Sequence, residues 1–193
     1  MSKSDIVFLL DESGSIGSNN FITTKTFVSN YTSRANFKEN ATQIAVVTFH
    51  STARPAFSLN EHKSAGQAVN AINAIRYSGG GTNIAVALSY VNEHAFTAAN
   101  GGREGAVKIV VLMTDGQSGD ASAQAQLLKD KGVTIVCIAI GSGVNYNQLK
   151  NIVSKPEYVL NVTNFNTLGS IEKVLLESTC KTSKKKSSAL RYE

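Results

Sequence analysis

The sequence lacks several features that would assign it to a common class of protein. None of its apolar runs approaches the roughly 20 residues that a membrane-spanning helix needs, so we predict no membrane span. No basic segment followed by an apolar segment of the secretory kind precedes the first apolar run. The chain is therefore either cytosolic or a domain taken from a longer precursor. Its two cysteines, Cys137 and Cys180, are too few for a disulfide framework, and Cys137 in "VTIVCIAI" is predicted to be a buried thiol.

Motifs of common enzyme classes are also absent. The sequence has no G-x-S-x-G, no G-x-G-x-x-G after the first apolar run, and no lysine after its glycine-rich segment to reach a phosphate. Glu12 is the one candidate general base beside the polar loop described below, and its place in that loop directs it elsewhere. The histidines stand where surface or core histidines are usual, at His50, His62 and His94. We predict that the protein is not an enzyme.

Positive charge is concentrated at the C-terminal end. The formal net charge is +5, and residues 181–193 carry +4 of it, which leaves about +1 for residues 1–180. A basic tail can bind nucleic acid or acidic surfaces, but such a run is more often a solvated linker, so we predict no nucleic-acid partner. A length of 193 residues fits one domain. We expect this domain to span residues 1–180 and residues 181–193 to form a basic polar tail or linker.

Apolar runs typical of buried strands alternate with segments of helical periodicity. Only Ser51 and Thr52 separate two of the strands, which must therefore pair antiparallel, and Pro55 places the second at an edge. The pattern predicts an α/β fold: a Rossmann-like open sheet of six strands, mostly parallel with one antiparallel edge strand, and helices on both faces. The predicted strands are 5–11, 43–50, 53–59, 107–115, 133–141 and 158–162, and the predicted helices are 19–34, 61–75, 84–95, 120–131, 146–153 and 165–178.

Small oxygen-bearing side chains follow the carboxyl ends of predicted strands. The loop "DESGS" holds Asp11, Ser13 and Ser15, Thr82 follows the glycine run 79–81, and Asp115 ends another strand. Ligands bind at this edge of open α/β sheets. Carboxylates and hydroxyls without His or Cys suit a hard cation, so we predict a site for Mg²⁺ or Mn²⁺. Taken singly, each aspartate has another explanation as a helix N-cap, and each hydroxyl as an ordinary loop residue.

The same residues resemble the von Willebrand factor type A domain. "DESGS" matches the D-x-S-x-S motif of that family, and Thr82 in "GGTN" and Asp115 in "MTDG" follow in the family's order, over about residues 4–178. The resemblance implies a metal-ion-dependent adhesion site. It implies direct coordination by Ser13 and Ser15, and by Thr82 in the ligand-ready form, whereas Asp11 and Asp115 bind mostly through water.

The resemblance also implies a partner and a location. Family members bind a protein ligand through a carboxylate that completes the metal shell, so we expect a secreted module of the extracellular matrix. Collagen or another matrix protein would be its ligand, and the module would be part of a larger multidomain chain. The single short helix after "AIG" points to the matrix-protein members, in which a cysteine at the place of Cys180 often pairs with one before the first strand. The expected ligand-binding rim comprises Ile16, Gly17, Ser18, Gly80, Gly81, Gln117 and Ser118.

Two other interpretations remain open at this point. The chain is also compatible with a structural matrix module that organises fibres without metal-mediated ligand binding. A third interpretation is an intracellular scaffold domain inside a larger complex.

Overall fold

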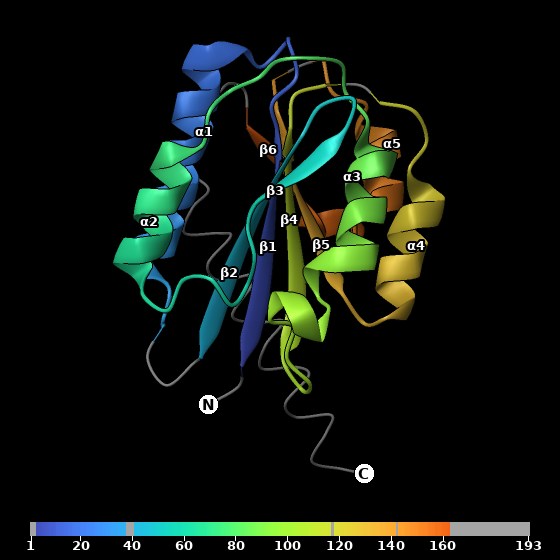
Figure 1. The fold of residues 1–193 in the computed structure, drawn as a ribbon. Coiled ribbons are helices and arrows are strands. Elements are labelled where there is room, and N and C mark those ends of the chain that lie inside the picture. The colour runs from blue at the N-terminus through green and yellow to red at the C-terminus, as the bar shows by residue number, and fades with distance from the viewer. Residues whose placement is uncertain (1–2, 38–40, 117, 142, 163–193) are drawn as a thin grey trace.

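The protein folds around one six-stranded sheet with helices on both sides (Figure 1). The computed structural model describes residues 3–37, 41–116, 118–141 and 143–162. The strand order is β3-β2-β1-β4-β5-β6, and every neighbouring pair is parallel except β2 and β3. The strands are β1 (Ser4–Asp11), β2 (Thr42–Phe49), β3 (Ala53–Phe57), β4 (Val107–Thr114), β5 (Thr134–Ile140) and β6 (Val159–Val162). The predicted fold class is confirmed.

Two helical layers cover the sheet. Helices α1 and α2 lie against one face, and α3, α4 and α5 lie against the other (Figure 1). The helices are α1 (Gly17–Arg34), α2 (Ala65–Ala74), α3 (Ile84–Tyr90), α4 (Ser122–Asp130) and α5 (Tyr146–Ile152). The predicted helix 84–95 continues beyond α3 as a five-residue π-helix, Val91–Ala95. Within the described residues no helix has the length and apolar character needed to cross a membrane.

Burial on both faces explains the uninterrupted apolar character of the central strands. Side chains alternate along a strand, so in β1 Phe8 and Leu10 pack under α1 and α2, whereas Val7 and Leu9 pack under the other helical layer. All four side chains are fully buried. Cys137 in β5 is likewise buried and free, as predicted.

The antiparallel strand stands at the edge of the sheet. β3 pairs with β2 alone, and Pro55 lies opposite Val47 beside a register shift. Proline lacks the N–H that a further strand would require, which is why an edge position tolerates it.

The sheet has one switch point in its strand order. From β1 the chain passes to β2 on one side and later to β4 on the other, so the order reverses between β1 and β4. The crevice outside the carboxyl ends of these two strands is the expected ligand position in such sheets. The predicted helix 165–178, Cys180 and the tail 181–193 lie outside the described residues, so the predicted domain boundary remains a prediction.

Candidate metal centre

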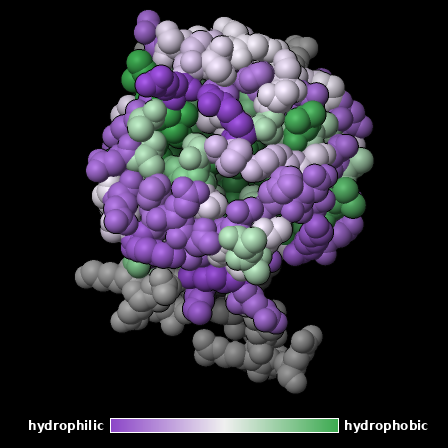
Figure 2. All heavy atoms as spheres, in the orientation of Figure 1, coloured by the Kyte–Doolittle hydropathy of each residue, from purple (hydrophilic) through white to green (hydrophobic). Residues whose placement is uncertain are grey.

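Three loops meet above the carboxyl ends of β1 and β4, at the upper edge of the molecule in Figure 1. They follow β1, precede α3 and follow β4, and they carry the five predicted metal ligands. In the space-filling view this upper edge is mostly pale, which indicates residues of intermediate hydropathy rather than a strongly hydrophilic or hydrophobic surface (Figure 2). The arrangement brings segments that are 100 residues apart into one small site.

The loop after β1 is fixed from inside the protein. Asp11 is 1% exposed, and both of its carboxylate oxygens accept hydrogen bonds. The backbone N–H of Ser13 donates to Oδ1 at 2.8 Å, and the hydroxyl of Thr114 donates to Oδ2 at 2.7 Å. The first bond folds the chain back at Ser13, as Asx turns do, and the second ties the loop to the end of β4.

The two loop serines face the second aspartate. The hydroxyls of Ser13 and Ser15 lie 3.2 Å apart, and the Ser15 hydroxyl donates to Oδ1 of Asp115 at 3.0 Å. Ser13 is buried, whereas Ser15 is exposed at the rim. The two hydroxyls, at alternate positions in the loop, therefore point to the same place.

Thr82 approaches from the third loop. A Cβ placed on Gly116 would lie only 3.0 Å from the Thr82 hydroxyl oxygen, so that hydroxyl stands directly beside the residue after Asp115. The Gly14 N–H donates to the Gly80 carbonyl at 2.8 Å, which joins the glycine-rich loop to the loop after β1. Gly80 has a φ of +130°, a backbone conformation that favours glycine.

Burial disfavours the charged form of both aspartates. Desolvation raises the pKa of Asp11 above its ordinary value against the lowering effect of the bonds from Ser13 and Thr114, and nearby Asp115 raises it further. Desolvation also raises the pKa of Asp115, and the hydrogen bond from Ser15 opposes this. A bound cation would stabilise both carboxylates in their charged form.

The donor set fits a hard divalent cation. Two carboxylates and three hydroxyls converge, and within the described residues no group of three or more His, Cys, Asp or Glu side chains forms a further candidate site. Because the carboxylates are few, a bound Mg²⁺ or Mn²⁺ would keep positions for water and for an outside oxygen. The helix-cap explanation for the aspartates does not hold, since α1 begins after Ile16 and α4 after Ala121, neither with a side-chain cap.

The structure describes six of the seven residues of the expected rim. Ser18 and Gly81 are exposed, and Gly17 opens α1. The Ser118 hydroxyl accepts a hydrogen bond from the Ile84 N–H at 2.9 Å and so joins the loop after β4 to the start of α3. Ile16 differs from the expectation: its side chain is 2% exposed and packs into the core under α1, because the turn before α1 directs it inward. Gln117 lies outside the described residues.

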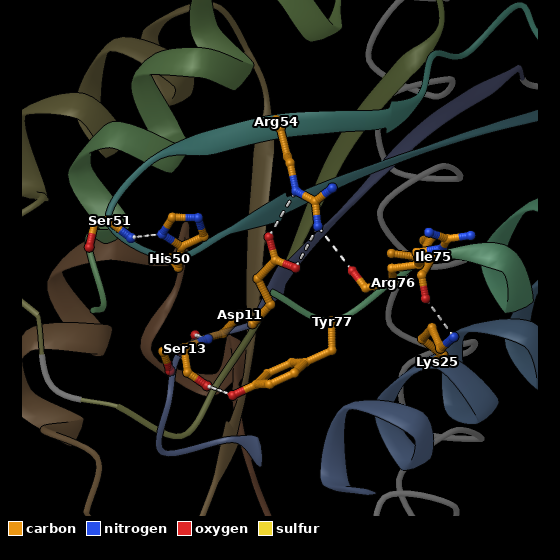
Figure 3. Close-up of polar contacts among 10 residues, drawn as sticks. Asp11, Ser13, Lys25, His50, Ser51, Arg54, Ile75, Arg76 and Tyr77 are labelled. Atoms are coloured by element: carbon orange, nitrogen blue, oxygen red, sulfur yellow. Dashed lines mark hydrogen bonds and ion pairs between the residues drawn. The ribbon is translucent and has the colours of Figure 1, made fainter. Parts of the chain in front are cut away.

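Several supporting residues had no recognisable signal in the sequence (Figure 3). The Tyr77 hydroxyl donates to the Ser13 carbonyl at 3.0 Å, and its ring packs against Phe21. Arg54 on the edge strand binds the Glu12 carboxylate at 2.9 Å, which directs Glu12 away from the metal ligands, as its loop position predicted. These contacts join segments that are distant in the sequence, and no sequence motif predicts them.

A family model matches the part of the chain that carries these residues. The model for the von Willebrand factor type A domain matches residues 5–174. The chain belongs to the von Willebrand factor type A domain family. Residues 5–174 cover all five predicted metal ligands and the whole described sheet apart from Ser4.

Curated relatives of this domain are matrix proteins. The chain is 37% identical to the human collagen α-6(VI) chain over 179 residues, 92% of this chain and 8% of the relative. It is 35% identical to the collagen α-1(XII) chain of Notophthalmus viridescens, covering 93% of this chain and 20% of the relative. Cuticlin-6 of Caenorhabditis elegans is 34% identical over 92% of this chain and 31% of the relative. The chain therefore spans less than a third of each of these proteins.

Solved structures give the same assignment. Proximal thread matrix protein 1 from the mussel byssus superposes with a TM-score of 0.89 at 32% identity, over 93% of this chain and 48% of that one. Another structure of that protein, with the same score and identity, has a zinc-occupied metal-ion-dependent adhesion motif. A relative with this fold thus holds a divalent metal at such a motif.

Proposed function

We propose that this domain is an extracellular adhesion or matrix-binding module that holds Mg²⁺ or Mn²⁺ at its metal-ion-dependent adhesion site. The cation coordinates an acidic residue of a protein ligand such as collagen or another matrix protein. The observation that carries the proposal is the convergence of Asp11, Ser13, Ser15, Thr82 and Asp115 at the switch point of the sheet.

Each residue has a distinct part in this scheme. The Ser13 and Ser15 hydroxyls, 3.2 Å apart, would hold the cation directly, and Thr82 would join them from the neighbouring loop. Both Asp11 oxygens already accept protein hydrogen bonds, so this carboxylate orients the loop and supplies charge at longer range. The ion supplies an electrophilic site for an anionic oxygen. Exposed Ser15 and the rim glycines leave that side open to a partner.

The proposal makes the protein a binding module rather than an enzyme. Glu12, the candidate general base, has both carboxylate oxygens bound by Arg54, which supports this choice. Secretion, and membership of a larger multidomain chain, are proposed because the relatives are collagen and cuticlin chains far longer than this domain.

The test is binding of the purified protein to immobilised fibrillar collagen in Mg²⁺ and in EDTA. Thr82→Ala should abolish binding in Mg²⁺. Thr26→Ala serves as the matched control, because it removes an exposed threonine hydroxyl that donates within α1, to the Ile22 carbonyl, and should leave binding unchanged. Binding that requires Mg²⁺ and Thr82 supports adhesion through the metal.

Two other outcomes would count against parts of the proposal. Collagen binding that survives both EDTA and Thr82→Ala would favour the structural matrix module, which organises fibres without the metal. An absence of collagen binding in either buffer would remove collagen as the ligand. A calorimetric titration with Mg²⁺ would then decide whether the metal site itself stands.

A further inference from the structure

A third carboxylate lies inside the loop that carries the metal ligands. Glu12 stands between Asp11 and Ser13, and its side chain is 0% exposed. Neighbouring Cα atoms are about 3.8 Å apart, so the Glu12 backbone adjoins two metal-site residues although its side chain points away from them. A buried carboxylate requires a partner, since an uncompensated charge in the interior is costly.

Arg54 provides that partner with a two-pronged contact. Its Nε donates to Oε1 of Glu12 at 3.1 Å, and its Nη2 donates to Oε2 at 2.9 Å. Both carboxylate oxygens are thereby occupied, in the fork geometry that makes arginine–carboxylate pairs strong and directional. The Arg54 side chain is 48% exposed, so the guanidinium lies between the buried Glu12 carboxylate and solvent.

The same guanidinium reaches the segment that leads to Thr82. Nη2 of Arg54 also donates to the Arg76 carbonyl at 3.0 Å (Figure 3). Next along the chain, the Tyr77 hydroxyl donates to the Ser13 carbonyl. Arg54 therefore links the loop after β1, which contains Glu12, to the segment that leads into the loop of Thr82.

The number of oxygen ligands, their charge and the flexibility of a site together set which cation it prefers. Mg²⁺ demands nearly octahedral geometry and keeps several waters, whereas Ca²⁺ takes more oxygen ligands in a flexible shell and gains from added charge. Two aspartates with three hydroxyls suit Mg²⁺. A third carboxylate released into a loosened loop would favour Ca²⁺ instead.

We infer that Arg54 is a positioning residue that sets the cation preference of the metal centre, because it holds the Glu12 carboxylate away from the ion. The inference rests on the proposed function, since it concerns the cation bound there. It adds a residue of the edge strand, 39 positions beyond the "DESGS" loop, to the determinants of the site.

The experiment compares the affinities for Mg²⁺ and Ca²⁺ by calorimetry in the wild type, in Arg54→Met, and in the double variant Arg54→Met with Glu12→Gln. Arg54→Met should lower the ratio of the Mg²⁺ to the Ca²⁺ association constant by about tenfold. The double variant should return the ratio to within about threefold of the wild type, because it has no carboxylate to release. It also leaves no unpaired buried charge, so it remains folded if Arg54→Met does not.

Arg103→Met is the matched control. Arg103 likewise pairs with a buried carboxylate, that of Asp5, through Nε to Oδ1 at 2.7 Å, at the opposite end of β1. Breaking this pair should destabilise the protein and leave the cation ratio unchanged. A general loss of stability would instead move the ratio equally in Arg54→Met and Arg103→Met, and that result would overturn the inference.

The remaining outcomes separate the inference from the proposed function. An unchanged ratio in Arg54→Met, or a ratio that stays shifted in the double variant, overturns the inference and leaves the metal site standing. If the wild type binds neither cation, the proposed function fails. Amide exchange of the metal-free protein then tests the positioning part. Ser13 and Gly14 should exchange faster in Arg54→Met but not in Arg103→Met, and equal rates would overturn it.

Discussion

The Thr114 hydroxyl provides a sharp test of how the candidate metal centre is held together. It donates to Oδ2 of Asp11 at 2.7 Å and accepts from the Gly116 N–H at 3.2 Å. Thr114 is 0% exposed and Asp11 is 1% exposed, so water cannot replace the donor in Thr114→Val. Valine preserves the shape and the β-branch, so the change removes little besides the hydroxyl.

The expected cost follows from that burial. A hydrogen bond to a charged group contributes about 1.5–3 kcal/mol, and a buried acceptor left without its donor loses at least that much. For a domain of this size 1 kcal/mol corresponds to about 2–4 °C in Tm. Thermal unfolding in EDTA should therefore show Thr114→Val melting about 3–12 °C below the wild type.

Thr48→Val is the control for this substitution. Thr48 is also a buried strand threonine, 1% exposed, but its hydroxyl has no hydrogen-bond partner among the residues that the structure describes. Replacing an unpartnered buried hydroxyl by a methyl group should leave Tm unchanged or raise it. Equal Tm shifts in the two variants would refute the reasoning, since the hydroxyl partners are what distinguish them.

Three further outcomes are expected. Burial raises the pKa of Asp11 in the metal-free fold, so the contribution of Asp11 to stability is complete below the ordinary aspartate pKa of about 3.9 and is lost as pH rises through the higher pKa of the folded state. In EDTA the Tm of Asp11→Asn should therefore gain on that of the wild type as pH rises above about 4, and a constant difference would contradict this. Gly80→Ala should lower the free energy of unfolding in urea by about 1–3 kcal/mol, because the φ of Gly80 is positive and the new Cβ would lie 2.7 Å from Nδ1 of His50. The control Gly66→Ala, on α2 where a Cβ meets no neighbour, should raise it by about 0.5–1 kcal/mol. Burial raises the pKa of the Cys137 thiol, so in a Cys180→Ser background a thiol reagent should label Cys137 only as fast as the protein unfolds. Rapid labelling of the native protein would contradict this, because it would show that Cys137 is accessible.

Local chemistry pointed to the candidate metal ligands in the sequence. A buried strand ends in Asp11, and serines follow at alternate positions. Side chains alternate along extended chain, and the carboxyl ends of parallel strands share one edge of the sheet, so these side chains are expected at one place on that edge. Asp115 followed from the same rule. Thr82 lies between α2 and α3 rather than after a strand, so its place rested on the glycine run before it and on the order of the family's motif. The position of Ile16 followed from neither, since the turn that begins α1 decides whether that side chain faces the partner or the core.

The sequence by itself determined the alternation of strands and helices, the antiparallel edge at Pro55 and the five candidate oxygen ligands. These depend on short-range patterns: apolar periodicity, a two-residue connection and residue type at strand ends. Only the tertiary structure decided what holds those ligands in place. The bonds of Thr114 to Asp11 and of Arg54 to Glu12 join residues 103 and 42 positions apart, and contacts at such separations depend on strand order and register, which no local pattern encodes.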